Sequence, residues 1–216
     1  MQEILKTEQL SRINIYALIS RILMNEVDET LLKSITYDEN ILSFFPSFEK
    51  WERRKQMSQK DLIEKYLNVD FTNLFLLHLI PYESFYRRDD MMMETGGDNP
   101  VQALYNDFDF RVELDKARVM SADHIGVEFE FMYKLCDAEY KALEDGQPEI
   151  AADIAAIEYN FLKEHILEWA PMYLLNVKSE AGTAFYFDAA ELALEFMMSD
   201  FEYLTELKNN EYKYSA

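Results

Sequence analysis

The stretch IGVEFEFMYKLCDAEYKAL, residues 125–143, decides the fold class of this 216-residue chain. Its apolar side chains recur every three or four positions, at Ile125, Phe129, Met132, Cys136, Tyr140 and Leu143. That spacing lays one apolar stripe along an α-helix and does not match the alternation of a half-buried strand. The stretch therefore predicts a long amphipathic helix that buries one face in a core.

Helical spacing continues on both sides of this stretch. Ser58 with Asp61 three positions later has the form of a capping box, which opens a helix. The chain has only five glycines and five prolines, too few for the many turns of a sheet protein. We predict an all-α fold, with breaks at Pro46, Pro81, residues 146–148 and Pro171. The predicted helices cover residues 3–24, 28–34, 38–45, 58–79, 100–108, 125–143, 150–169 and 185–207.

The length and composition predict one domain, because 216 residues with 49% hydrophobic content can fill a single core. Glycine, asparagine and proline at residues 96–100 have turn chemistry and indicate a loop. The run Met91 to Met93 in that loop is either a mobile segment or, if exposed, an adaptable apolar surface. Within the domain we expect an N-terminal helical cluster (1–57), a connecting helix with an aromatic turn (58–86), a flexible loop (87–99) and a main helical bundle (100–216).

The charge and the cysteine content restrict partners and location. Forty-one acidic against 21 basic residues give a net charge of −20, which repels nucleic acid and anionic membrane surfaces. The same field attracts basic peptides, although an acidic surface also serves solubility alone. The single Cys136 is expected to be a small buried hydrophobe in a reducing cytoplasm. No signal peptide or stable membrane insertion is expected, since the longest strongly apolar stretch is residues 74–80.

Familiar catalytic motifs are missing from the sequence. The glycine pair at residues 96–97 lacks the Gly-Lys of a phosphate-binding loop. None of His78, His124 and His165 has a glutamate three positions before it, as a di-iron bundle requires. One cysteine and three scattered histidines match no zinc spacing, and no Gly-x-Ser-x-Gly turn occurs. We therefore expect a protein that is not an enzyme, with no metal and no cofactor.

Two short stretches carry groups that suit peptide binding. His124 and Glu128 are four residues apart at a helix start, with Asp123 at the expected cap position. These residues either form a local cap or hydrogen-bond the guanidinium or backbone of a peptide at a cleft edge. The second stretch, residues 81–86, holds Tyr82, Ser84, Phe85 and Tyr86 and is either a packed loop anchor or part of a groove.

At these residues the chain resembles the TorD/DmsD/NarJ family of cytoplasmic chaperones for molybdenum-containing oxidoreductases. Residues 70–75 (DFTNLF) resemble the family's D-Y-x-x-L-F, and residues 81–86 (PYESFY) resemble its P-x-x-S-x-Y. Residues 123–132 (DHIGVEFEFM) match D-H-x-x-x-E-x-x-x-M, and residues 161–171 (FLKEHILEWAP) are similar to F-L-x-x-H-L-x-x-W. Phe71 stands where Tyr is usual, and Ser121 where many members have Pro. The ordered set spans about residues 65–175.

The resemblance implies a function and a site. It implies a TorD-like helical chaperone that binds the twin-arginine leader peptide and the apo form of a molybdoenzyme catalytic subunit, assists cofactor insertion and delays export. Asp123 and His124 would border the peptide groove, followed by Glu128, Ser84, Tyr86, Tyr82 and Phe85. An acidic protein with an apolar aromatic groove complements a leader that is cationic and then apolar. Some members bind guanine nucleotide weakly; without a phosphate loop that has little support here. The chain is expected to be a monomer or a homodimer.

Two alternatives remain open on the sequence. One is a metal-dependent helical enzyme using His124, Glu128 and His165. The other is a generic acidic helical adaptor for some other basic partner. The chaperone hypothesis requires a concave surface beside Asp123 and His124, and burial of both away from any concavity would contradict it.

Overall fold

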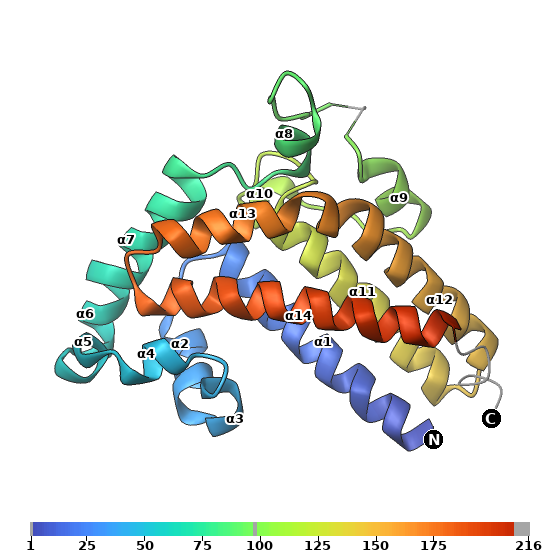
Figure 1. Cartoon of the computed structure of the whole chain (residues 1–216), viewed down its shortest axis with the longest axis horizontal. Coiled ribbons are helices and arrows are strands. Elements are labelled where there is room, and N and C mark those ends of the chain that lie inside the picture. Colours follow the sequence, from blue (N-terminus) through green and yellow to red (C-terminus); the bar gives the residue numbers. More distant parts are fainter. Residues whose placement is uncertain (1, 97–98, 210–216) are drawn as a thin grey trace. The chain divides into compact units, whose positions relative to one another are not determined.

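The computed structural model describes residues 2–96 and 99–209, and every regular element in this part of the chain is a helix (Figure 1). The predicted all-α fold is confirmed. The long helices are α1 (Gln2–Met24), α11 (Ile125–Glu144), α12 (Pro148–Phe161), α13 (Leu167–Glu180) and α14 (Ala184–Asn209). Among the described residues, no helix is both long and apolar enough to cross a membrane.

Shorter helices and three π-helical turns complete the described chain. The predicted helix over residues 58–79 runs from Gln59 to His78 and alternates between α- and π-helical winding. Ser58 Oγ accepts a hydrogen bond from Asp61 N at 3.1 Å, as its capping role requires. The short α-helices are α2 (Glu29–Tyr37), α3 (Glu39–Leu42), α4 (Pro46–Lys50), α5 (Glu52–Gln56), α6 (Gln59–Leu62), α7 (Asn68–Phe71), α8 (Glu83–Arg87), α9 (Gln102–Asp107) and α10 (Leu114–Ala117). The π-helical turns are η1 (Ile63–Leu67), η2 (Thr72–His78) and η3 (Leu162–Ile166).

The expected break before Pro46 is confirmed, since α3 ends at Leu42, whereas the expected break at Pro171 is wrong. Pro46 begins α4, where proline is tolerated because the first N–H groups of a helix have no intrahelical partner. Pro171 lies inside α13, which continues to Glu180 with Tyr173 and Leu174 fully buried. Burial of this apolar face compensates for the one hydrogen bond that Pro171 cannot donate.

The chain folds into two compact units. The first unit is built from the described parts of residues 1–24, 82–170 and 196–216, and the second from residues 25–81 and 171–195. The first unit therefore contains α1, α8 to α12, η3, the start of α13 and the end of α14. It holds all the residues that the sequence suggests for peptide binding.

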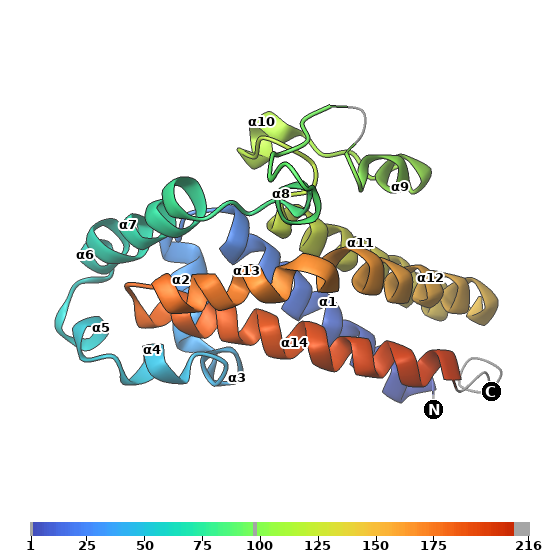
Figure 2. The same cartoon turned by 45° about the horizontal axis from the view of Figure 1, so that its top comes forward.

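The core of the first unit forms where α1 packs along α11 (Figures 1 and 2). Gly126 allows the close approach, since a Cβ at this position would lie 2.6 Å from Met24 Cγ. Ser20 Oγ donates a hydrogen bond of 2.8 Å to Gly126 O across the same contact. The predicted stripe of α11 is buried at five of its six positions, and Tyr140 is half-buried.

A buried arginine holds three carboxylates inside this core. Arg12 of α1 is 5% exposed, and its Nε and Nη1 lie 2.6 Å from Asp200 Oδ1 and 3.2 Å from Glu139 Oε2. Arg12 Nη2 also pairs with Glu158, and Tyr16 Oη donates to Asp200 Oδ2 at 2.6 Å. Burial raises the pKa of Glu158 well above its usual value, although Arg12 opposes the shift. The cluster joins α1, α11, α12 and α14 through one guanidinium.

In the second unit, Asp70 of α7 caps a distant helix. Its Oδ1 accepts a hydrogen bond from Gly182 N at 3.0 Å, and its Oδ2 accepts from Thr183 N at 2.8 Å and from Thr183 Oγ1 at 2.6 Å. These donors precede the first residue of α14. The neighbouring Phe71 is 4% exposed and packs against Phe75, so this site needs no hydroxyl there. The motif at residues 70–75 therefore has a structural role in this unit.

Candidate functional site

The site centres on α8, which lies against the N-terminal end of α11 (Figure 2). The backbone of Tyr82 pairs with that of His124. Glu83 N donates to Asp123 O at 3.0 Å, and Ser84 N donates to Asp123 Oδ2 at 2.8 Å. Because these are two of the unpaired N–H groups in the first turn of α8, Asp123 caps that helix from 39 residues away.

The prediction that Asp123 caps its own helix is wrong. The N-cap of α11 is His124, whose Nδ1 accepts a hydrogen bond from Gly126 N at 3.0 Å. The Tyr82 ring packs edge-on against the imidazole, with ring centroids 5.2 Å apart. The reason for the difference is that the carboxylate of Asp123 finds free N–H groups on α8, which leaves its own helix to the next residue.

His124 is held as a neutral imidazole. Its side chain is buried, and an Nδ1 that accepts from a backbone N–H places the remaining ring proton on Nε2. Burial lowers the pKa of His124 to about 3, although the Asp123 carboxylate opposes the shift. At neutral pH this residue therefore acts as an uncharged helix cap.

Replacing His124 with asparagine should change how stability depends on pH. The unfolded imidazole takes a proton below about pH 6.5 and the folded one does not, so the wild type loses stability as the pH falls towards 3. Asparagine also caps helices but does not titrate. We expect His124→Asn to gain about 2 kcal/mol relative to the wild type between pH 7 and pH 5, measured by urea denaturation. A difference that does not vary with pH would contradict the neutral imidazole.

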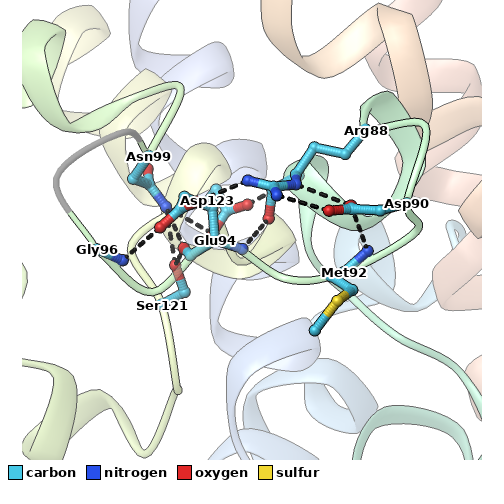
Figure 3. A network of polar contacts seen from close by, with 9 residues as sticks. Arg88, Asp90, Met92, Glu94, Gly96, Asn99, Ser121 and Asp123 are labelled. Carbon is cyan, nitrogen blue, oxygen red and sulfur yellow. Dashed lines mark hydrogen bonds and ion pairs between the residues drawn. The ribbon is translucent and has the colours of Figure 1, made fainter.

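Asp123 also anchors the segment that follows α8 (Figure 3). Asn99 Nδ2 lies 2.9 Å from Asp123 Oδ1 and 3.0 Å from Glu94 O. Ser121 Oγ donates to Glu94 O at 2.7 Å, and Glu94 N donates to Ser84 Oγ at 2.9 Å. The segment is thus tied at Glu94 to the side chains that surround Asp123. Ser121, the position where many members of the resembled family have Pro, supplies one of these bonds.

The loop itself contains a network of ion pairs. Arg88 binds the carboxylate of Asp90 through Nε and Nη2, at 2.9 and 2.7 Å, and Glu94 through Nη1 at 2.6 Å (Figure 3). Between these residues Met91 adopts a left-handed backbone with φ +53°, which a side chain rarely favours. Met91 and Met92 are 62% and 63% exposed. This network therefore presents two thioether side chains to solvent.

Three carboxyl groups are fully buried at this end of α11, and each has different hydrogen-bonding partners. Asp123 accepts from Ser84 and Asn99 as described. Glu83 pairs with Arg87, and its two oxygens lie 3.1 Å from His165 Nδ1. Glu128 has one described donor, Trp169 Nε1 at 3.1 Å. Burial, then the nearby Glu83, raises the pKa of Glu128 well above its usual value, so the site favours the protonated form of this carboxyl group.

Replacing Glu128 with glutamine should reduce the loss of stability that the protein shows as the pH rises to neutral. The unfolded glutamate ionises above about pH 4.5 and the folded one, whose pKa is raised, only at higher pH, so the native residue loses stability as the pH rises through this window. Glutamine has the same shape without this loss. We expect Glu128→Gln to gain on the order of 2 kcal/mol relative to the wild type between pH 5 and pH 7. Glu202→Gln, at an exposed position of α14, is the control and should show no such trend.

The structure brings all seven predicted site residues together. Tyr82, Ser84, Asp123 and His124 share one network, and Glu128 joins Tyr86 through Trp169, on which the Tyr86 ring stacks at 5.3 Å. Phe85 packs edge-on against Tyr86 at 5.2 Å. Only Phe85 and Tyr86 are half-buried; the other five are buried. Asp123 and His124, expected at a cleft edge, are therefore closed to direct contact in this state.

Sequence reasoning gave no role at this site to the residues that complete it. These are Glu83, Arg87, Glu94, Asn99 and Ser121, together with His165, which the sequence suggested only for the metal-dependent alternative. The sequence could have indicated the ion pair of Glu83 with Arg87, because residues four positions apart lie on one face of a helix. The hydrogen bonds of Asn99 and Ser121 join different loops, so the spacing of residues in the sequence could not predict them.

Two concavities of the first unit lie near these residues. A small one of about 80 Å³ is lined by Asn99 and Ser121, both partners of Asp123. It is below the usual size of a ligand pocket. A larger one of about 460 Å³ opens between residues 108–111 and the middle of α11, lined by Phe108, Phe110, Phe131 and Leu135 among others.

The metal-site alternative finds no support in the geometry. His124 Nδ1 accepts from its own helix, His165 binds Glu83, and Glu128 binds Trp169. Within residues 2–96 and 99–209, no three His, Cys, Asp or Glu side chains are grouped to hold a metal ion.

Comparisons with known proteins agree with this architecture. Chaperone protein TorD of Salmonella bongori is 25% identical over 210 residues, which cover 91% of each chain. Chaperone protein TorD of Vibrio parahaemolyticus is 24% identical over 220 residues, covering 94% of this chain and 99% of the relative. The expectation that the chain is not an enzyme agrees with these relatives, which are named as chaperones. No solved structure matches the chain significantly.

The family profile described as nitrate reductase delta subunit matches residues 40–174. This range is more than half of the chain and includes α8, the loop that follows it and the start of α11. The predicted kinship with the TorD/DmsD/NarJ family is confirmed: the chain belongs to the nitrate reductase delta subunit family.

Proposed function

We propose that this protein is a maturation chaperone for a molybdenum-containing redox enzyme and that it binds the twin-arginine leader peptide of that enzyme. The family membership and the relatives named as chaperones support the first part. The observation that carries the second part is the gathering of all seven predicted residues around α8, beside an exposed apolar and acidic loop. The proposed client is the apo form of the enzyme, held until its cofactor is inserted.

The proposed binding surface is α8 with the loop at residues 88–96. Met91 and Met92 offer adaptable apolar contact, and the half-buried Phe85 and Tyr86 adjoin them in the chain. Exposed Asp89 and Asp90 add negative charge. This combination complements a segment that is cationic and then apolar.

In this proposal Asp123 acts through its neighbours, because its side chain is fully buried. It holds α8 by Ser84 N and the loop by Asn99. A peptide on α8 and the loop would therefore depend on Asp123 without touching it. His124 has the same indirect role, since it caps α11 and packs against Tyr82.

Isothermal titration of a synthetic twin-arginine leader tests the proposal. We expect Met91→Ser with Met92→Ser to weaken binding at least about tenfold without a change in melting temperature. Met172→Ser, which removes a methionine that is 63% exposed in the second unit, is the matched control and should bind as the wild type does. No binding of any leader by the wild-type protein would refute leader recognition and favour a chaperone or adaptor that holds another part of its partner.

A further inference from the structure

We infer that Glu83 and the carbonyl oxygen of Glu164 form a guanidinium-binding site, that Arg87 occupies it in the free protein, and that a client arginine takes its place. The identity of the client rests on the proposed function. The site itself rests on the geometry of this chain alone.

The contact between Glu83 and Arg87 supplies the first step. Glu83 is fully buried, yet its partner Arg87, one turn later in α8, is 41% exposed. Arg87 Nη1 pairs with Glu83 Oε1 and also donates to Glu164 O at 2.9 Å. A buried carboxylate is therefore covered from the solvent side by a guanidinium that has one end in water.

The backbone acceptor, the carbonyl oxygen of Glu164, belongs to a π-helical turn. Glu164 lies in η3, a π-helical turn, and the wider winding of such turns displaces carbonyl groups from the regular hydrogen-bond ladder. Its carbonyl oxygen receives the Arg87 side chain, 77 residues away in the sequence. Short π-helical segments occur frequently at functional sites, and this one adds a neutral acceptor to a carboxylate.

The groups behind Glu83 hold its carboxylate in place. His165 Nδ1 lies 3.1 Å from both Glu83 oxygens and orients the carboxylate. Glu128 is fully buried and lies close to Glu83. The exposed Glu168 follows η3 on the surface. A cation that leaves the site therefore leaves a buried carboxyl group without its cationic partner, which favours its replacement by another cation.

The arrangement selects a guanidinium over an ammonium. Both contacts of Arg87 are made by Nη1, so the preference comes from hydration: a guanidinium is weakly hydrated and loses less on entering a partly buried site than a compact, strongly hydrated ammonium does. Tyr86, between Glu83 and Arg87 in α8, stacks on Trp169 and is half-buried. Its ring gives an apolar flank for the aliphatic stem of an incoming arginine.

Chemical rescue of Arg87→Ala tests the site without any peptide. We expect ethylguanidinium at millimolar concentration to raise the melting temperature of this variant by about 3 °C, saturably, while ethylammonium does not. Arg88→Ala is the matched control, since Arg88 is 40% exposed and also paired, but with the exposed carboxylate of Asp90 and the half-buried one of Glu94. It should show no rescue. An equal response of wild type, Arg87→Ala and Arg88→Ala would overturn the site.

A second variant allows the same test if Arg87→Ala does not fold. Arg87→Met keeps the aliphatic stem of the side chain and removes only the guanidinium, so it gives the same readout if Arg87→Ala does not fold. Adding Glu83→Gln to either variant should abolish the rescue, because the carboxylate is then lost. Rescue that persists in the double variant would also overturn the site.

Leader titration tests the exchange of arginines. If Arg87 competes with the client, Arg87→Ala should bind a twin-arginine leader roughly fivefold more tightly than the wild type and should lose this gain with a twin-lysine leader. Equal affinities of wild type and variant would overturn the exchange while leaving leader recognition intact. If neither protein binds any leader, the proposed client is wrong. The rescue experiment alone then decides whether the guanidinium site exists.

Discussion

Replacement of Arg12 by methionine should lower the free energy of unfolding by about 3–5 kcal/mol at neutral pH. The guanidinium of Arg12 is the cation that binds Glu139, Glu158 and Asp200, and all three carboxyl groups are buried. Removing it leaves charge in the core without compensation. Urea denaturation followed by circular dichroism measures the loss.

The matched control for Arg12 is Arg111→Met. Arg111 is 86% exposed and pairs with Asp109, which is 85% exposed, so this change should cost less than about 0.5 kcal/mol. The Arg12 variant should regain part of its stability on acidification, since burial raises the pKa of Glu158 and favours its neutral form. A cost as small as that of the control would contradict the role of Arg12 in joining α1 to the rest of the first unit.

Replacement of Asp123 by asparagine should destabilise the protein by about 1–3 kcal/mol and loosen the loop at residues 88–96. Each Asp123 oxygen accepts from a donor, Ser84 N on one side and Asn99 Nδ2 on the other. An amide presents a donor to one of them and leaves a buried group unpaired. Hydrogen exchange measured by mass spectrometry should show faster exchange at residues 84–96 than in the wild type.

Asp137→Asn is the control for Asp123, because Asp137 lies on α11 and pairs with Lys141 at the surface. It should change stability by less than about 0.5 kcal/mol and leave the loop protected. If Asp123→Asn left exchange at residues 84–96 unchanged, Asp123 would not be the anchor of this surface.

The long helices were predictable from the sequence because an apolar stripe repeats over many turns. Residues 125–143 and 185–207 lie within α11 and α14. Ser58 marked a helix start correctly, since its capping bond is local. Helices α4, α5, α8 and α10, none longer than five residues, are too short for a periodic pattern and were missed.

The two motif aspartates illustrate what a single sequence does not contain. Asp70 and Asp123 each cap a helix far away in the chain, at residue separations of 113 and 39. Sequence reasoning placed Asp123 at the start of its own helix, because local spacing is the only guide without coordinates. In the described part of residues 87–99, expected to be a flexible loop, Asn99 donates to Asp123, and Glu94 O accepts from Asn99 and Ser121. Tertiary hydrogen bonds thus decided the geometry of the site, while helical periodicity decided the fold.

The most direct test of leader recognition at α8 and its loop is a nuclear magnetic resonance spectrum of protein with ¹³C-labelled methionine methyl groups, recorded with and without a twin-arginine leader. We predict that the resonances of Met91 and Met92 shift on addition of the leader. Those of Met172 and Met198, which are also exposed, should stay in place. A leader that binds and leaves Met91 and Met92 unperturbed would contradict the proposed surface.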